Sequence, residues 1–183
     1  MFAGRLASIL LFMLSLGFLV HAAGPMPRAV ANRRDTGSLS QLTTLEGMTR
    51  KQLDSCMRVK TIDEAKPIIQ VMISNIKSTT ESLTSTGKIE VDDNAKTDIA
   101  VRMASIISLI VKILLSLSQK LGCDAIASLC GDIDTALEAL LVAVNTCVEA
   151  ILPLVAKKIT DVKTEALLKL DLVECAKLLG FAA

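Results

Sequence analysis

The sequence predicts an all-α fold: an up-down bundle of about five helices, with two long apolar central helices and disulfide staples. Apolar residues recur at helical spacing over long stretches, and helix-start and helix-end signals divide the chain at intervals. No strand-like alternation longer than residues 88–91 occurs. Together these three observations favour helices throughout and give no sign of a β-sheet.

The two central helices are predicted within residues 97–157, joined by a short break at 122–131. In the first, a 4-3-4-3-4 spacing keeps one stripe of the helix apolar: Ile99, Met103, Ile106, Ile110, Ile113 and Leu117. The second has a similar stripe: Ile133, Leu137, Leu140, Val144, Ile151 and Val155. Further apolar residues beside both stripes leave little polar face, which is typical of central helices in a bundle or of membrane helices.

The first two helices are placed by their starting signals. Ser38 with Gln41 and Thr61 with Glu64 both have the spacing of a capping box, in which side chains satisfy the first backbone N–H groups of a helix. Leucines and isoleucines at helical spacing follow each box. The predicted ranges are 38–57 and about 61–84.

The central and last helices are bounded by acidic residues, glycine and proline. Asp92 and Asp93 place negative charge at the start of the first central helix, where the helix dipole favours it, and Gly122 ends that helix. Pro153 predicts a kink or an end to the second central helix near residue 152. The last helix is predicted over 160–180.

The N-terminal part of the chain predicts secretion. Residues 1–22 have the form of a signal peptide, with Arg5, an apolar run and a small-residue cleavage site ending at Ala22. Residues 23–37 lack helical periodicity and are interpreted as a propeptide or linker, and Arg33-Arg34 within it resembles a dibasic processing site. Residues 38–183 are then a single helical domain, located outside the cell or in a cell wall. A membrane anchor at 1–22 is the alternative, although the apolar run is short for a span.

Removal of the first 34 residues changes the chemistry that is available. The whole chain has 20 basic and 19 acidic residues; the first 34 hold four arginines and no acid, so the remainder has 16 against 19, a net charge of −3. The same cut removes His21, the only histidine, and the chain has no Trp or Tyr. Histidine-dependent catalysis and a His-containing metal site are therefore excluded for the mature chain, and no phosphate-binding glycine loop occurs. We expect no enzyme activity, no cofactor and no metal, and the absence of a basic excess argues against nucleic-acid binding.

Five cysteines in a secreted chain predict disulfides. In an up-down bundle Cys147 and Cys175 lie at similar heights on either side of a turn near residue 159, so a bridge between them is expected. A second bridge is expected among Cys56, Cys123 and Cys130, leaving one thiol.

A narrow polar stripe on the second central helix suggests a ligand site. Its members fall on one side of the helix: Asp134, Glu138, Asn145 and Glu149. The simpler interpretation is the solvent edge of that helix; the other is a polar mouth beside an apolar cavity, with Ser108 and Ala143 as small residues among large ones. The candidate ligand-binding residues are Ile106, Ile110, Ile113, Leu140, Val144, Ile151, Glu138 and Glu149.

Three functions remain open. The first is a secreted binder of hydrophobic ligands (fatty acid or sterol) or hydrophobic surfaces, supported by 51% hydrophobic residues and a mean hydropathy of +0.53. In composition the chain is similar to fungal cell-wall proteins that bind hydrophobic surfaces: secreted, all-α and poor in aromatic residues. The second is a secreted effector or interaction protein that binds a protein partner and whose bundle is only a scaffold. The third is membrane insertion by the central helices, against which Lys112 and Glu149 would each cost about 2.5–3.5 kcal/mol at the centre of a bilayer.

Overall fold

A computed structural model describes residues 32–162 and 164–181. In these ranges the protein is all-helical, as predicted, and has no strand. The helices are α2 (Asn32–Cys56), α3 (Ile62–Thr86), α4 (Asp93–Leu121), α5 (Cys123–Cys147), α6 (Leu152–Lys158), α7 (Thr164–Lys169) and α8 (Val173–Leu178). The predicted signal peptide, and residues 23–31 of the predicted linker, lie outside the described residues.

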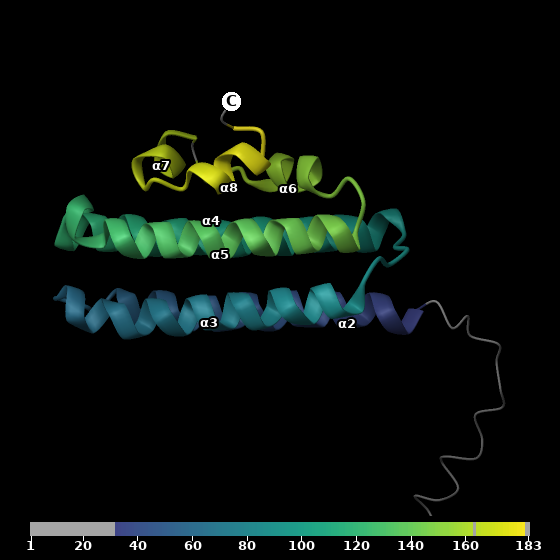
Figure 1. Ribbon diagram of the computed structural model, residues 1–183, viewed down its shortest axis with the longest axis horizontal. Helices are drawn as coiled ribbons and strands as arrows, with labels where there is room; N and C mark the ends of the chain where they lie inside the picture. The colour runs from purple at the N-terminus through teal and green to yellow at the C-terminus, as the bar shows by residue number, and fades with distance from the viewer. Residues whose placement is uncertain (1–31, 163, 182–183) are drawn as a thin grey trace, which may run out of the picture. The chain divides into compact units, whose positions relative to one another are not determined.

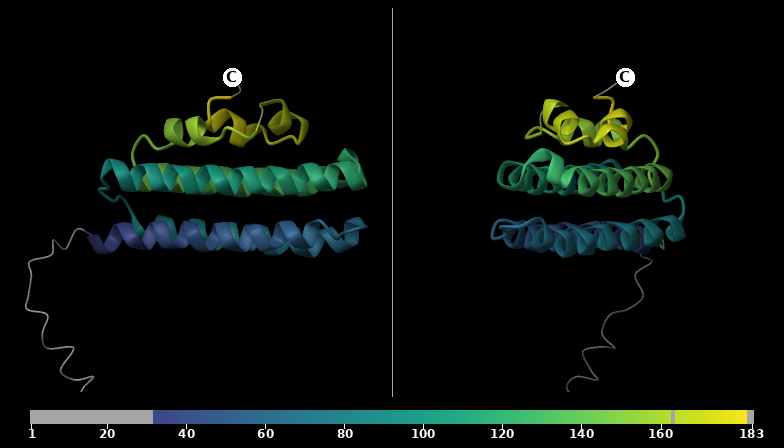
Figure 2. Two further views of the ribbon diagram at one scale, coloured as in Figure 1. Left: turned by 180° about the vertical axis from the view of Figure 1, so that it is seen from behind. Right: turned by 60° about the vertical axis from the view of Figure 1, so that its left-hand side comes forward.

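The helices of residues 32–181 are stacked in three layers (Figure 1). Helices α2 and α3 form one layer, α4 and α5 form the second, and the three short helices form the third. Helix α2 packs on α4 and α3 on α5, while α6 and α8 cover the other side of the same two helices (Figure 2). The middle layer is therefore covered on both sides, which explains why α4 and α5 are the most apolar helices.

Hydrogen bonds between distant segments show that successive long helices alternate in direction. The Lys120 ammonium near the end of α4 donates to the Met57 carbonyl just after α2, at 2.5 Å. The Ile89 amide in the α3–α4 connection donates to the Cys147 carbonyl at the end of α5, at 2.9 Å. The ends of α2 and α4 thus lie together, and the end of α5 lies beside the end of α3.

Two of the predicted helix starts are confirmed. The Thr61 hydroxyl accepts from the Glu64 amide at 3.3 Å, and the Asp92 carboxylate accepts from the Ala95 amide at 2.7 Å. The Glu64 carboxylate accepts from the Lys60 amide. The arrangement therefore differs from a full capping box only in that the returning bond comes from residue 60 and not from Thr61. Gly122, with φ of 92°, ends α4 as predicted.

The first helix and the central break differ from the prediction. Helix α2 begins at Asn32, six residues before the predicted start, and Ser38 lies inside it with a buried hydroxyl that has no hydrogen-bond partner among the described residues. The break at 122–131 is reduced to Gly122 alone, because α5 continues through Gly131. A glycine in a helix costs about 1 kcal/mol, and burial of the neighbouring Leu129, Cys130 and Ile133 outweighs it.

The C-terminal part is more divided than predicted. Helix α5 ends at Cys147, and a new short helix begins at Leu152 with Pro153 in its first turn, where proline is tolerated. The single helix predicted over 160–180 is two helices separated at Asp171, whose φ is 57°. Four long and three short helices in the described residues thus replace the predicted five.

The predicted disulfide staples are wrong: all five cysteines are free. The Cys147 thiol faces α3 and donates to the Leu83 carbonyl at 3.1 Å, whereas the Cys175 amide lies against Asp134 on the other side of α5. Asp134 is thirteen residues from Cys147 along α5, a distance of about 20 Å. The height argument assumed one continuous last helix, and the breaks after α5 remove that register.

We expect five free thiols in denatured, unreduced protein and one fast-reacting thiol in the native protein. Cys123 is exposed, and the other four are buried. Burial raises the pKa of Cys56 and Cys130 to about 11 and of Cys175 to about 12, so their reactive thiolates are scarce. Titration with a chromogenic disulfide reagent, with and without denaturant, measures both numbers. Three or fewer thiols in the denatured protein would show that a disulfide is present.

Helix α4 is the one helix in the described residues that is long and apolar enough to cross a membrane. Its most apolar 18-residue window has a mean hydropathy of 2.1, but 56% of that window is buried inside the bundle. A core helix of a layered bundle meets the same criterion, so this property by itself does not favour insertion.

Candidate functional site

The apolar residues predicted to line a cavity lie in the packed core. Six of them are at most 2% exposed and belong to one continuous apolar cluster: Ile106, Ile110, Ile113, Leu140, Val144 and Ile151. Ala143 is also buried. The grooves described below are lined by other residues, so the structure does not bring the predicted ligand-binding residues around an open space.

The predicted polar stripe is divided among separate roles. Asp134 is 6% exposed, and its carboxylate accepts from the Glu174 amide at 2.9 Å and the Cys175 amide at 3.0 Å. Glu149 is exposed and pairs with Lys88 at 2.8 Å. The hydrogen bond from Lys88 and its charge lower the pKa of Glu149. Glu138 is half-buried. Asp134 thus fixes the start of α8, and Glu149 pairs with the α3–α4 connection.

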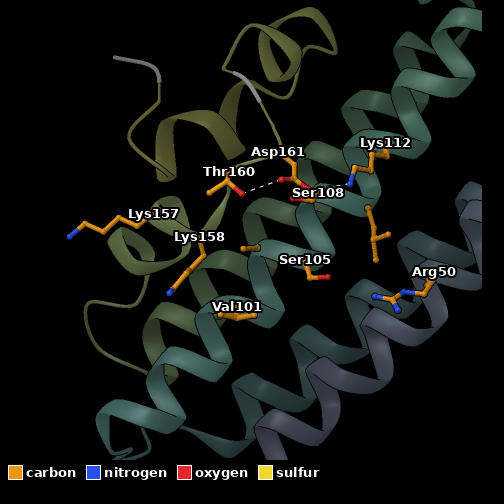
Figure 3. A pocket seen from close by; sticks show the side chains of 11 residues that line it. Arg50, Val101, Ser105, Ser108, Lys112, Lys157, Lys158, Thr160 and Asp161 are labelled. Atoms are coloured by element: carbon orange, nitrogen blue, oxygen red, sulfur yellow. Dashed lines mark hydrogen bonds and ion pairs between the residues drawn. The ribbon is translucent and has the colours of Figure 1, made fainter.

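A groove runs along the outer edge of α4 (Figure 3). It holds about 610 Å³ and is bounded by α2 on one side and by the end of α6 and the residues after it on the other. Its lining residues are Arg50, Val101, Ala104, Ser105, Ser108, Leu109, Lys112, Lys157, Lys158, Thr160 and Asp161. We call it the α4 groove.

The floor of the α4 groove carries both apolar and hydroxyl side chains, and its rim is basic. Val101, Ala104 and Leu109 come from successive turns of α4, and Val101 is 45% exposed although it is a large apolar residue. Among its described residues, the lining contains four cationic side chains and one carboxylate. Lys157 and Lys158 have no ion-pair partner among the described residues.

A buried carboxylate beside the groove joins α2 to α4. The Glu46 side chain is 9% exposed and accepts from Arg102 at 2.7 Å, from Ser105 at 2.8 Å and from Arg50 at 3.0 Å. Burial raises its pKa, but the hydrogen bonds from Arg102 and Ser105 and the charges of both arginines together lower it below the ordinary 4.5. Glu46 thereby fixes Arg50 and Ser105, two members of the groove lining.

An ion pair closes one part of the groove. Lys112 on α4 donates to Asp161 at 3.3 Å, and the Thr160 hydroxyl donates to the same carboxylate at 3.1 Å. These hydrogen bonds, with the charge of Lys112, lower the pKa of Asp161. Figure 3 shows the three side chains in line across the space between α4 and the segment after α6.

Three other hollows have smaller volumes, and the first, of about 450 Å³, lies along α3 and is lined mainly by polar and charged residues, among them Gln70, Lys77 and Glu81. A neutral groove of about 230 Å³ between α2 and α3 is lined largely by hydroxyl and amide side chains, among them Thr44, Asn75 and Thr79. A pocket of about 120 Å³ lies beside Cys123 and Cys130. Within the described ranges, no group of three or more His, Cys, Asp or Glu side chains is arranged to hold a metal ion.

Sequence reasoning identified Ser108 as a small residue among large ones but missed the rest of the groove. The available signals were the Lys157-Lys158 pair after Pro153 and Val101, an apolar residue outside the stripe predicted for its helix. Neither signal indicates that α2, α4 and α6 meet at this edge, because that meeting depends on the stacking of three layers.

Glu46→Gln is expected to lower the free energy of unfolding by about 1–3 kcal/mol at neutral pH, because two arginines lose a buried acceptor charge. The folded pKa of Glu46 is depressed, so its contribution is present above the unfolded value near 4.5 and is lost as pH falls through the folded value. Urea unfolding of wild type and variant from pH 7 to pH 3 should therefore converge in acid. Glu81→Gln on the exposed face of α3 is the control, and a wild-type advantage that persists undiminished at pH 3 would contradict the assignment.

Comparisons of the chain with protein-family models, with curated proteins and with solved structures found no match.

Proposed function

We propose that this protein is a non-enzymatic binder of ligands with an apolar chain or ring system, in the class of fatty acids or sterols, and that the α4 groove is the binding site. The observation that supports this is an open groove in which apolar side chains of α4 lie among hydroxyl and basic side chains. Sites for small molecules in proteins occupy about 300–1,000 Å³ and combine apolar walls with a few polar groups. The α4 groove, at about 610 Å³, lies within that range.

The groove replaces the cavity that the sequence suggested between the central helices. Ile106, Ile110 and Leu140 are fully buried against their neighbours, and a ligand there would have to displace packed side chains. The α4 groove needs no such displacement. Its floor belongs to α4, one of the two central helices. We therefore keep the proposed ligand class and place the site at the edge of α4.

Secretion is part of the proposal, with the extracellular space or a cell wall as the location. It rests on the signal-peptide pattern of residues 1–22. The dibasic pair Arg33-Arg34 lies in the first turn of α2, so cleavage there would shorten that helix by three residues and leave its core-facing leucines in place. N-terminal sequencing of the secreted protein distinguishes a start near Asp35 from one near Ala23.

Binding of a fluorescent fatty acid and a fluorescent sterol, with and without Ser108→Phe, tests the proposed site. A phenyl ring at Ser108 would fill the groove from its α4 side, so micromolar binding by wild type should weaken at least tenfold while the melting temperature changes little. Ser128→Phe is the matched control, because Ser128 is an exposed serine of α5 outside the groove lining. Absence of binding by wild type to both probes and to apolar surfaces would refute the proposal.

A secreted effector or interaction protein is the second candidate, and the packed core favours it. The exposed large apolar residues are separated in sequence: Met48, Met57, Val71, Val101, Val142 and Leu168. Such a distribution is expected of a scaffold that binds a protein partner through polar contacts. The third candidate, membrane insertion, would have to unpack α4 and break the Lys112–Asp161 pair. Both candidates predict no saturable binding of monomeric ligand, and leakage of vesicle contents separates the third from the second.

A further inference from the structure

We infer that the α4 groove selects its ligand by an anionic head, so that the ligand is a long-chain carboxylate and not a sterol or another neutral lipid. This inference rests on the proposed function, since it names the ligand class for the same site. It is carried by the charge distribution around the groove, by the state of each cation there, and by a hydroxyl on the groove floor.

The cations of the rim come from three different parts of the fold. Arg50 is on α2, Lys112 is on α4, and Lys157 and Lys158 are the last residues of α6. Asp161 is the only carboxylate in the lining. Because Arg50 pairs with Glu46 and Lys112 pairs with Asp161, the unpaired positive charge comes from Lys157 and Lys158 on the α6 side, and it favours an anion in the groove over a cation.

Two of these cations already have partners, and two are available. Arg50 is paired with Glu46 and Lys112 with Asp161, while the two lysines at the end of α6 are exposed and have no ion-pair partner among the described residues. In Figure 3 Lys158 extends towards α4 above Val101, and Lys157 points away from the other labelled side chains. Lys158 is thus the cation best placed to meet a head group at the groove, and Lys157 adds charge from further out.

The hydroxyl groups of the lining likewise include some that are already hydrogen-bonded and one that is available. Ser105 donates to Glu46 and Thr160 donates to Asp161, so both are already used. The Ser108 hydroxyl makes no hydrogen bond within the part of the chain that the structure describes, and it lines the groove from α4. It can donate to a carboxylate oxygen, while Lys158 supplies positive charge nearer the Val101 end of the groove, and Val101, Ala104 and Leu109 offer apolar contacts for the chain.

A neutral ligand gains nothing from this rim. Covering Lys158 with a sterol or an alcohol would remove water from an ammonium group without supplying a counter-charge, which is unfavourable. A carboxylate replaces the lost hydration with an ion pair. Because Lys158 is largely in solvent, each such pair is weak, and the expected preference is about tenfold in Kd for the whole head and about two- to fivefold for one lysine.

The experiment compares oleate, oleyl alcohol and cholesterol below their aggregation limits, using the full secreted chain and calorimetric or dialysis measurements of Kd. Oleate and oleyl alcohol have the same chain, so their ratio isolates the head. We expect oleate to bind about tenfold more tightly than the alcohol, and this advantage to shrink as salt rises. Lys158→Gln should weaken oleate two- to fivefold and leave the alcohol unchanged, with an unaltered melting temperature.

Lys60→Gln is the matched control, because Lys60 is an exposed lysine in the α2–α3 connection outside the groove. Equal affinity for oleate and oleyl alcohol, or an equal loss of oleate affinity in the Lys60 and Lys158 variants, overturns the anionic selection and leaves the proposed function standing. Tighter binding of cholesterol than of oleate also overturns it. Failure of all three lipids to bind refutes the proposed function itself.

Discussion

Asp134→Asn is expected to lower the free energy of unfolding by about 2–4 kcal/mol, although it changes one atom in a side chain far from the α4 groove. The Asp134 carboxylate accepts one amide hydrogen on each oxygen, from Glu174 and Cys175 at the start of α8. An asparagine has one acceptor oxygen, so one buried amide would face an NH₂ group. A charge-assisted hydrogen bond contributes about 1.5–3 kcal/mol, and an unsatisfied buried donor costs about 1–3 kcal/mol.

Chemical denaturation measures the loss, and the reactivity of Cys175 shows where it acts. Cys175 belongs to α8 and is fully buried, whereas Cys147 is buried on the opposite side of α5, against α3. Loosening of α8 alone should increase the labelling rate of Cys175 and leave that of Cys147 nearly unchanged. Asp132→Asn, an exposed neighbour on α5, should change stability by less than about 0.5 kcal/mol. Equal stability of Asp134→Asn and Asp132→Asn would show that the carboxylate does not fix α8.

Ile110→Ala is expected to destabilise the protein by about 2–5 kcal/mol and to leave ligand binding at the α4 groove intact after correction for the unfolded fraction. Ile110 is fully buried in the middle layer, so its truncation would leave a cavity among packed side chains. Truncation of a side chain that lines an open ligand cavity would cost less and would change affinity directly.

Thermal or urea unfolding measures the stability change, and titration with the fluorescent fatty acid measures affinity. Val142→Ala on the exposed face of α5 is the control, because its side chain is 48% exposed. A small stability loss for Ile110→Ala together with a large loss of affinity would return the binding site to the space between the central helices.

Much of the fold was predictable because it depends on local signals. The periodicity of Ile99 to Leu117 and the caps at Asp92 and Gly122 act within a few residues, and they placed α4 correctly. The start of α2 and the continuity of α5 through Gly131 were not predictable in this way. There, burial against other layers decides the conformation, and a glycine or a missing cap is a smaller effect than the packing of an entire helix face.

The disulfide prediction was wrong, and the α4 groove was not predicted, for a different reason. The prediction for Cys147 and Cys175 depended on the register of one continuous helix after Pro153, and a left-handed residue at Asp171 divides that segment. The α4 groove depends on where the last residues of α6 rest against α4. No short-range pattern in the sequence states which layer a seven-residue helix will cover, so Lys157 and Lys158 were not connected with Arg50.

The four long helices pack between layers as α2 with α4 and α3 with α5, which affects when the chain can fold during its synthesis. Helices α2 and α3 contact each other, but α2 also packs on α4 and α3 on α5, so the first two helices alone leave part of their apolar sides uncovered. The apolar face of α3, with Ile69, Met72 and Ile76, stays open until α5 has left the ribosome. The bond from the Ile89 amide to the Cys147 carbonyl likewise forms only when α5 is complete. A pause in translation before Cys147 would therefore leave the α2–α3 hairpin with one exposed apolar side, and exposed apolar surface promotes aggregation and chaperone binding.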